Sequence, residues 1–297
     1  MSMRVATFGQ TSTVLQNAMK TQARLAEKQV QESTGLISTD YGGLGSSAGV
    51  VASLEVSAAR TEASISTAEQ ALSRIEMIYD ALGSMSDLMT DLRSQLSAAS
   101  VNTDTTLQAT AEAMLEELTS LLNTQYEGRY LFAGAETETK PVDISGLSTT
   151  DLTTEDTSYY QGDDYVQSVR LSSDRSLDYG ITADNTAFET AIRTLSYLAT
   201  ATDLTSEDLS AASEMLVDAQ DQILALQSIT GIKASTLETY ISDQEDYLAT
   251  VTDLATTLAS VDIAVVAVEA ANYKTQLEAS YSALGTMTSL SVLDYLR

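Results

Sequence analysis

Hydrophobic residues in the last third of the chain are spaced alternately three and four positions apart, which is the pattern of a helix that packs along other helices. The series begins at Leu209 and ends at Val268. At a rise of ~1.5 Å per residue, a single helix over this run would be about 90 Å long. Such a helix needs partners along its whole side, and the seam predicted to pack against them includes Leu237, Val251, Leu254, Leu258, Val261 and Val265.

A second series of the same kind predicts another long helix in the first third of the chain. It runs from Leu54 to Leu82 and continues to Leu96 after a phase slip of one turn. A third helix is predicted over 107–121, after a turn at 100–106, and a short connection of this kind makes consecutive helices antiparallel neighbours. The packing positions that we predict for the second helix include Leu54, Ile65, Leu72 and Leu82.

Residues 130–185 have a different pattern, in which short aromatic and aliphatic clusters alternate with glycine and aspartate. This pattern is typical of short strands and hairpin turns. Helical spacing returns over 187–199. The predicted fold class is therefore mainly α, a long antiparallel helical bundle or coiled-coil rod formed by both chain ends, with a small β-rich insert in the middle.

The two ends of the chain differ from the long helices between them, because their apolar faces are thin. The first 35 residues offer Phe8, Leu15, Met19 and Val30, interrupted by serine and glutamine, and such a helix is marginal alone. Both ends therefore need a partner. We predict a terminal assembly domain of 1–45 plus 256–297, a helical rod domain of 46–129 plus 186–255, and a β-hairpin-rich insert of 130–185.

Charge separates the ends from the middle in the same way. The formal net charge is -27, from 42 acidic and 15 basic residues. Residues 1–35 carry a net +2 and residues 262–297 a net -2, so the two ends together are neutral. Because like charges repel when crowded, this distribution predicts packed ends and a solvated middle. It also argues against nucleic acid or an anionic membrane as a partner.

The composition restricts the chemistry further. The chain has no cysteine and no histidine, which excludes thiol catalysis and a general-base histidine, and no motif of an enzyme is present. Asp163 and Asp164 beside Gly162 could bind calcium, but the full ligand series of a calcium loop is missing. We therefore predict no enzyme activity, no metal and no cofactor. No run approaches ~18 apolar residues, and the first residues lack the apolar core of a Sec signal, so neither a membrane span nor such a signal is expected.

Four short segments resemble those of flagellar proteins. Ser33-Thr34-Gly35 resembles the S-T-G turn of the flagellin superfamily. The segment 128–134, GRYLFAG, resembles one typical of flagellar hook-filament junction proteins, as do 160–163, YQGD, and the ending 291–296. The residues that carry the likeness include Ser33, Thr34, Gly35, Gly128, Tyr130, Phe132, Gly134, Leu293, Tyr295 and Leu296.

The resemblance implies a structural subunit of the bacterial flagellum, exported by the flagellar type III apparatus and assembled helically at the hook tip. The partners it implies are further copies of the chain in a helical ring, another hook-associated protein on the hook side, flagellin or another filament-side subunit, and an export chaperone. It also implies that the ends are disordered in the monomer and fold on assembly. For Gly128 and Gly134, ordinary turn chemistry and a loop that contacts a neighbouring subunit both stay open.

Two other functions are compatible with the sequence. A small flagellin, which would form the filament itself, is close in class to a junction protein. A coiled-coil adaptor belongs to a different class, but it would not need termini that are depleted in charge and in apolar residues. The aromatic segment 130–134 and the ending 293–296 favour the junction protein.

Overall fold

The computed structural model describes residues 2–98, 104–147, 151–201 and 203–289. Helices dominate, and the strands are short, so the predicted mainly α class is confirmed. The chain forms two compact units, a terminal unit of residues 1–60 and 247–297 and a central unit of residues 61–246. The boundaries predicted for three domains stay a prediction.

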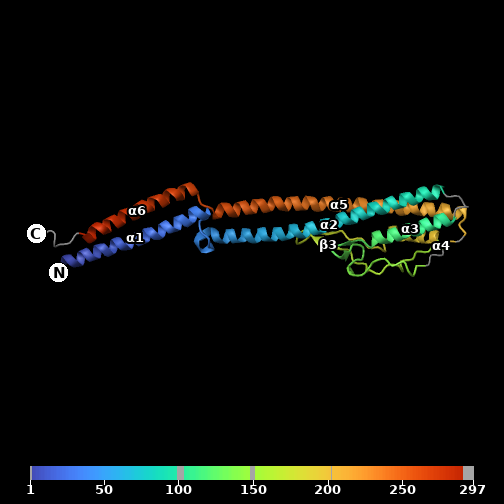
Figure 1. Cartoon of the computed structure of the whole chain (residues 1–297), viewed down its shortest axis with the longest axis horizontal. Helices are drawn as coiled ribbons and strands as arrows, with labels where there is room; N and C mark the ends of the chain where they lie inside the picture. Colours follow the sequence, from blue (N-terminus) through green and yellow to red (C-terminus); the bar gives the residue numbers. More distant parts are fainter. Residues whose placement is uncertain (1, 99–103, 148–150, 202, 290–297) are drawn as a thin grey trace. The chain divides into compact units, whose positions relative to one another are not determined.

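The terminal unit is built around two helices from opposite ends of the sequence. α1 (Ser2–Thr34) and α6 (Ile263–Ser289) lie side by side and antiparallel, as Figure 1 shows. The unit also contains the 3-10 helix η1 (Tyr41–Ser47), the start of α2 (Ala48–Ala98) and the end of α5 (Ser206–Ala259).

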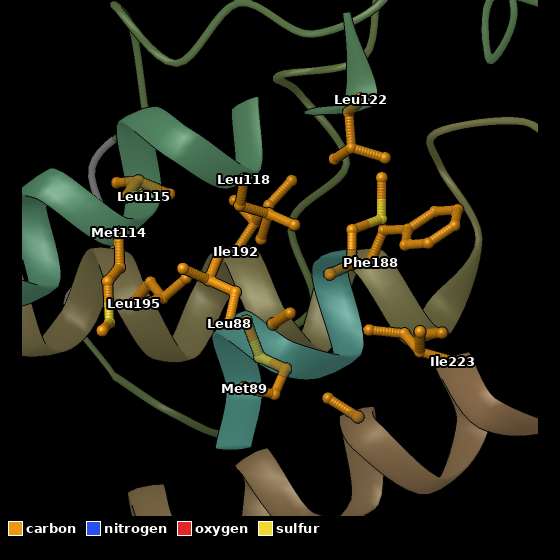
Figure 2. Close-up of a cluster of buried hydrophobic side chains, with 14 of the residues drawn as sticks. Leu88, Met89, Met114, Leu115, Leu118, Leu122, Phe188, Ile192, Leu195 and Ile223 are labelled. Carbon is orange, nitrogen blue, oxygen red and sulfur yellow. The ribbon is translucent and has the colours of Figure 1, made fainter. Parts of the chain in front are cut away.

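The central unit holds the main hydrophobic core. Its helices are the rest of α2 and α5, together with α3 (Asp104–Leu122) and α4 (Thr186–Thr200). α4 begins where the Asn185 side chain accepts a hydrogen bond from the Ala187 N–H, and nearly all of its side chains are buried. Figure 2 shows side chains of all four helices pointing toward one another, among them Leu88, Met89, Met114, Leu115, Leu118, Leu122, Phe188, Ile192, Leu195 and Ile223.

The described strands form two short hairpins and one bridge, and the first hairpin lies almost wholly before the insert predicted at 130–185. β1 (Gln125–Tyr126) pairs with β2 (Arg129–Tyr130), β3 (Ser168–Arg170) pairs with β4 (Ser176–Asp178), and Val142 bridges to Tyr160. Between β1 and β2, Glu127 and Gly128 have φ of 51° and 75°, and this positive pair is typical of a tight two-residue hairpin turn. The expected strand at 130–132 ends at Tyr130, and the next two side chains are buried in the core.

The predictions for the second and third helices are confirmed, since α2 and α3 contain the expected ranges. Most of the predicted turn at 100–106 lies outside the described residues, and 104–106 already belong to α3. The prediction of one helix from Leu209 to Val268 is wrong. α5 ends at Ala259 and α6 begins at Ile263. Among the described helices, none is long and apolar enough to cross a lipid bilayer.

Candidate assembly surface

A short antiparallel backbone pairing, called the clasp below, joins residues 35–37 to residues 259–261. The Ile37 N–H donates to the Ala259 carbonyl at 2.7 Å, and the Val261 N–H donates to the Gly35 carbonyl at 2.9 Å. Leu36 and Ser260 are the bridge partners between these two bonds. The three residues 260–262 must leave helical geometry to make this pairing, which is why α5 and α6 are separate helices.

The S-T-G segment makes the clasp possible, because it ends α1. Gly35 has φ of 71°, a conformation that favours glycine, and its N–H donates to the Gln31 carbonyl at 2.8 Å. The hydroxyls of Ser33 and Thr34 both donate to the Val30 carbonyl, at 2.9 and 2.8 Å. Carbonyls of the last helical turn are thereby satisfied, and the chain turns toward residues 259–261.

On the other side of the clasp, Asp262 starts α6. Its Oδ1 accepts from the N–H groups of Ala264 and Val265 at 2.9 and 3.3 Å, and its carbonyl accepts from the Val266 N–H at 3.0 Å. Aspartate at such a position satisfies the free N–H groups of a first helical turn, and its charge is favourable at this end of the helix. The spacing of hydrophobic residues in the sequence does not indicate this helix cap.

The face between α1 and α6 combines small, polar and larger apolar side chains. Lys28 forms a 2.8 Å ion pair with Glu269, and this contact raises the pKa of Lys28 above its ordinary value of 10.5. Lys28 also donates to Gln31, whose amide donates to the Ile37 carbonyl at 2.8 Å, so the ion pair connects to the clasp. The less exposed positions on α1 follow a three-four spacing and are Thr11, Val14, Ala18, Thr21, Leu25, Lys28 and Gln31, and those on α6 include Val266, Ala270, Tyr273, Leu277, Ser280 and Leu284.

Other large apolar side chains point away from this face. Met19 and Val268 are each 63% exposed, although residues of these types are usually buried. We call the exposed set the outward stripe, and it comprises Leu15, Met19 and Val30 on α1 and Ile263, Val265 and Val268 on α6. Tyr281 is also half exposed, but its hydroxyl donates to Gln22 of α1 at 3.4 Å. The thin apolar face predicted for the first helix therefore lies mainly on its exposed side.

The seam expected from the sequence is buried over part of its length. Ile65, Leu82, Leu237 and Val251 are buried, whereas Leu54, Leu72, Leu258 and Val261 are partly buried. Leu254 and Val265 are exposed, at 46% and 53%. The expected register differs from the observed one for these two residues, and beyond the break at 260–262 the inward position is Val266 in place of Val265. Whether the exposed pair packs against another subunit stays a prediction.

The aromatic motif in the central unit points into the core. Phe132 is fully buried, with its ring edge-to-face against Phe188 at a centroid distance of 5.8 Å. Its carbonyl accepts from the Ala183 N–H at 2.9 Å. Gly128 has no neighbour within 4 Å of where a Cβ would lie, so its role here is the turn between β1 and β2. Tyr130 is partly buried. Leu293, Tyr295 and Leu296 lie outside the described residues.

Gly134 and Asp163 form a tight backbone junction. A Cβ on Gly134 would lie 2.0 Å from the Asp163 Oδ1, and that oxygen accepts from the Ala135 N–H at 2.6 Å. Tyr160 Oη donates to the Asp163 carbonyl at 2.6 Å, and the Gln167 amide donates to the Gly134 carbonyl at 2.9 Å. The carboxylate considered for calcium therefore binds the backbone, and no cluster of three potential metal ligands occurs in the described part of the chain.

A buried ion pair that the sequence analysis did not identify ties the insert to α4. Arg193 binds Glu189 through two nitrogens, at 3.0 and 3.1 Å, and also donates to the Leu152 carbonyl. Glu189 accepts from the Asp156 N–H at 3.0 Å. The four-residue spacing on a helix was the only signal of the pair in the sequence, and exposed helices show that spacing as well.

Comparison with known proteins finds similarity to flagellar proteins. Residues 5–137 match the family described as the bacterial flagellin N-terminal helical region. The fold is similar to that of a Vibrio parahaemolyticus protein described as flagellar hook-associated, with 15% identity, a TM-score of 0.50, and coverage of 74% of this chain and 98% of that one. It is also similar to FlgL from Bacillus cereus, with 17% identity, a TM-score of 0.50, and coverage of 69% and 98%.

No curated protein matches the chain by sequence similarity. Flagellin-like structural proteins are not enzymes, so the family itself agrees with the prediction of no catalytic activity. The match at 5–137 includes the S-T-G segment, the clasp residues 35–37 and the GRYLFAG segment. Residues 5–137, somewhat less than half of the chain, are therefore similar to the flagellin N-terminal region, and the fold of the chain is similar to that of flagellar hook-associated proteins.

Proposed function

We propose that this protein is the structural subunit that joins the flagellar hook to the filament, exported and then assembled helically at the hook tip. The observation that carries the proposal is the outward stripe on the terminal unit. The two similar structures, one described as hook-associated and one named FlgL, support the junction over other flagellar positions.

The stripe is an unusual surface for a chain that stays alone. Exposed apolar side chains that gather in one region mark sites of protein interaction. In the terminal unit the buried hydrophobic side chains among the described residues are Ala18, Val51, Val251, Val266 and Ala270, so larger apolar groups lie outside than inside. Further subunits packed along the stripe would bury these groups.

Charge favours the same surface. The central unit carries 33 acidic and 8 basic residues, so close contact between copies there would be repulsive. The ends are neutral as a pair and already contain the Lys28–Glu269 ion pair. Contacts between copies through the terminal unit therefore cost the least electrostatic energy.

The partners follow from a position at the junction. They are further copies of this chain in a helical ring, another hook-associated protein on the hook side, and flagellin or another filament-side subunit, all outside the cell. An export chaperone that covers the outward stripe before export would prevent premature association. Leu254 and Val265, which are exposed in the single chain, are candidates for contacts in the ring.

Deletion of the gene tests the proposal. A strain without a junction subunit should be non-motile, with bare hooks, and exported flagellin should accumulate in the medium. The purified protein should not grow long filaments on its own seeds, because a junction must match a different lattice on each side, whereas a flagellin contact propagates. Flagellin itself is the second candidate, favoured by the family match, and micrometre-length filaments of this chain alone would establish it.

A further inference from the structure

A cavity of about 460 Å³ lies in the central unit, between α2, the β1–β2 hairpin and β3. Buried Val169 and Tyr179 form part of its lining, and the partly buried ring of Tyr126 forms another part. Neither the core described above nor the outward stripe includes this cavity.

Three arginines from three different elements line the cavity. Arg74 comes from α2, Arg129 from β2 and Arg170 from β3. The central unit has only 8 basic residues against 33 acidic ones, so three of its few cations gather at one place. Glu127 also lines the cavity, but among the described residues none of the three arginines forms an ion pair with it.

The Arg74 side chain has two nitrogen atoms in this cavity without a hydrogen-bond acceptor from the described residues. Its Nε and Nη2 atoms are buried, yet no hydrogen-bond acceptor within the described part of the chain reaches them. Burying polar nitrogens of a cation without acceptors is unfavourable, and the arrangement persists because the rest of the unit holds it. An acceptor with two oxygens would satisfy both nitrogens, because the guanidinium group binds planar carboxylates through two parallel bonds.

We propose that this cavity binds carboxylate groups, with Arg74 as the buried contact and Arg129 and Arg170 as the outer ones. The carboxylate has two possible sources, a free polycarboxylate or an acidic segment of a neighbouring polypeptide. A second copy of this chain is rich in such segments. The site is a property of the single chain, so its test does not depend on the junction proposal.

The experiment measures binding to the purified full-length chain by calorimetry and by the shift in melting temperature, at constant ionic strength. The two probes are citrate and tetraglutamate. The variants are Arg74→Gln and the double change Arg129→Gln with Arg170→Gln. The matched control is Arg175→Gln, which removes an exposed arginine in the turn between β3 and β4, outside the cavity lining.

At least one probe should bind saturably to the native chain and to the Arg175→Gln control. The same probe should bind Arg74→Gln at least about tenfold more weakly. The double variant keeps Arg74, and it should also bind more weakly. Binding of citrate alone identifies a free polycarboxylate as the source, and binding of tetraglutamate identifies an acidic segment. Absence of saturable binding of both probes overturns the proposal, as does equal affinity of the native chain and both cavity variants.

Discussion

Val265 and Val266 are adjacent on α6 and lie in opposite environments, so the same substitution at each separates folding of the terminal unit from assembly. Val266 is 4% exposed on the face toward α1, whereas Val265 is 53% exposed in the outward stripe. We compare Val266→Asp with Val265→Asp. The pair is matched in residue type, in helix position and in the charge that each change adds.

The burial of the two side chains sets the expected magnitudes. Full burial of a valine side chain contributes about 1.5–3 kcal/mol, and a carboxylate in its place adds a desolvation cost of several kcal/mol. Val266 and Ala270 are the buried apolar side chains on the described part of α6, so Val266→Asp should unfold the α1–α6 pair. A substitution at the exposed Val265 should cost under about 0.5 kcal/mol in the monomer.

The assay is amide hydrogen exchange of the purified monomer, read over residues 9–34 and 263–287, followed by a motility test of each variant in the deletion strain. The paired helices predict protection of both ranges in the native monomer, in contrast to the disordered ends that the resemblance implies. Val266→Asp should lose protection in both ranges, while Val265→Asp should keep the protection of the native chain and still fail to restore motility. If Val265→Asp exposes both ranges as strongly as Val266→Asp, the inward and outward faces are assigned wrongly. If it restores full motility, the outward stripe is not an assembly surface.

Three further outcomes follow from the geometry. Gly134→Ala should destabilise the central unit by more than the roughly 1 kcal/mol expected for Gly128→Ala, because both have positive φ but only at Gly134 would the Cβ fall 2.0 Å from a carboxylate oxygen; chemical denaturation measures both. Phe132→Ala should cost about 3–5 kcal/mol in the same measurement, and a cost near zero would mean that the ring does not pack in the core. Glu269 raises the pKa of Lys28, so the contact between them stabilises the fold fully below pH 10.5, and this stabilisation is lost as the pH rises through the raised pKa. Lys28→Met should therefore lower the melting temperature at pH 8, and the difference in melting temperature from the native chain should shrink above the raised pKa.

The sequence predicted the helices of the central unit well, because their partners lie in the same chain. Leu82 and Leu237 are buried as expected, and burial along a helix leaves a three-four spacing that can be read without a structure. For α1 and α6 the spacing does not show which neighbour a side chain faces, because Met19 and Val268 are exposed in the single chain and their packing against another subunit stays a prediction.

The break between α5 and α6 could not be predicted from spacing. It depends on backbone hydrogen bonds to residues 35–37, which lie more than 200 positions away in the sequence. The S-T-G motif indicated a turn after the first helix, but not its partner. The conformation of Gly134 likewise depends on Asp163, and the arginine cavity on three residues that only the tertiary fold brings together.

The clasp has a consequence for how the terminal unit can diverge. Its two bonds join main-chain atoms, and the side chains of Leu36 and Ser260 take no part in them. Gly35 is tied to its residue type by its positive φ, Asp262 by its cap, and Gln31 by its bond to the Ile37 carbonyl. The clasp also fixes where α1 begins to run beside α6, which prevents the two helices from sliding by a heptad of about 10.5 Å. Mutations can therefore change the side chains of the outward stripe, and with them the neighbouring subunit that it contacts, without changing how α1 and α6 are aligned.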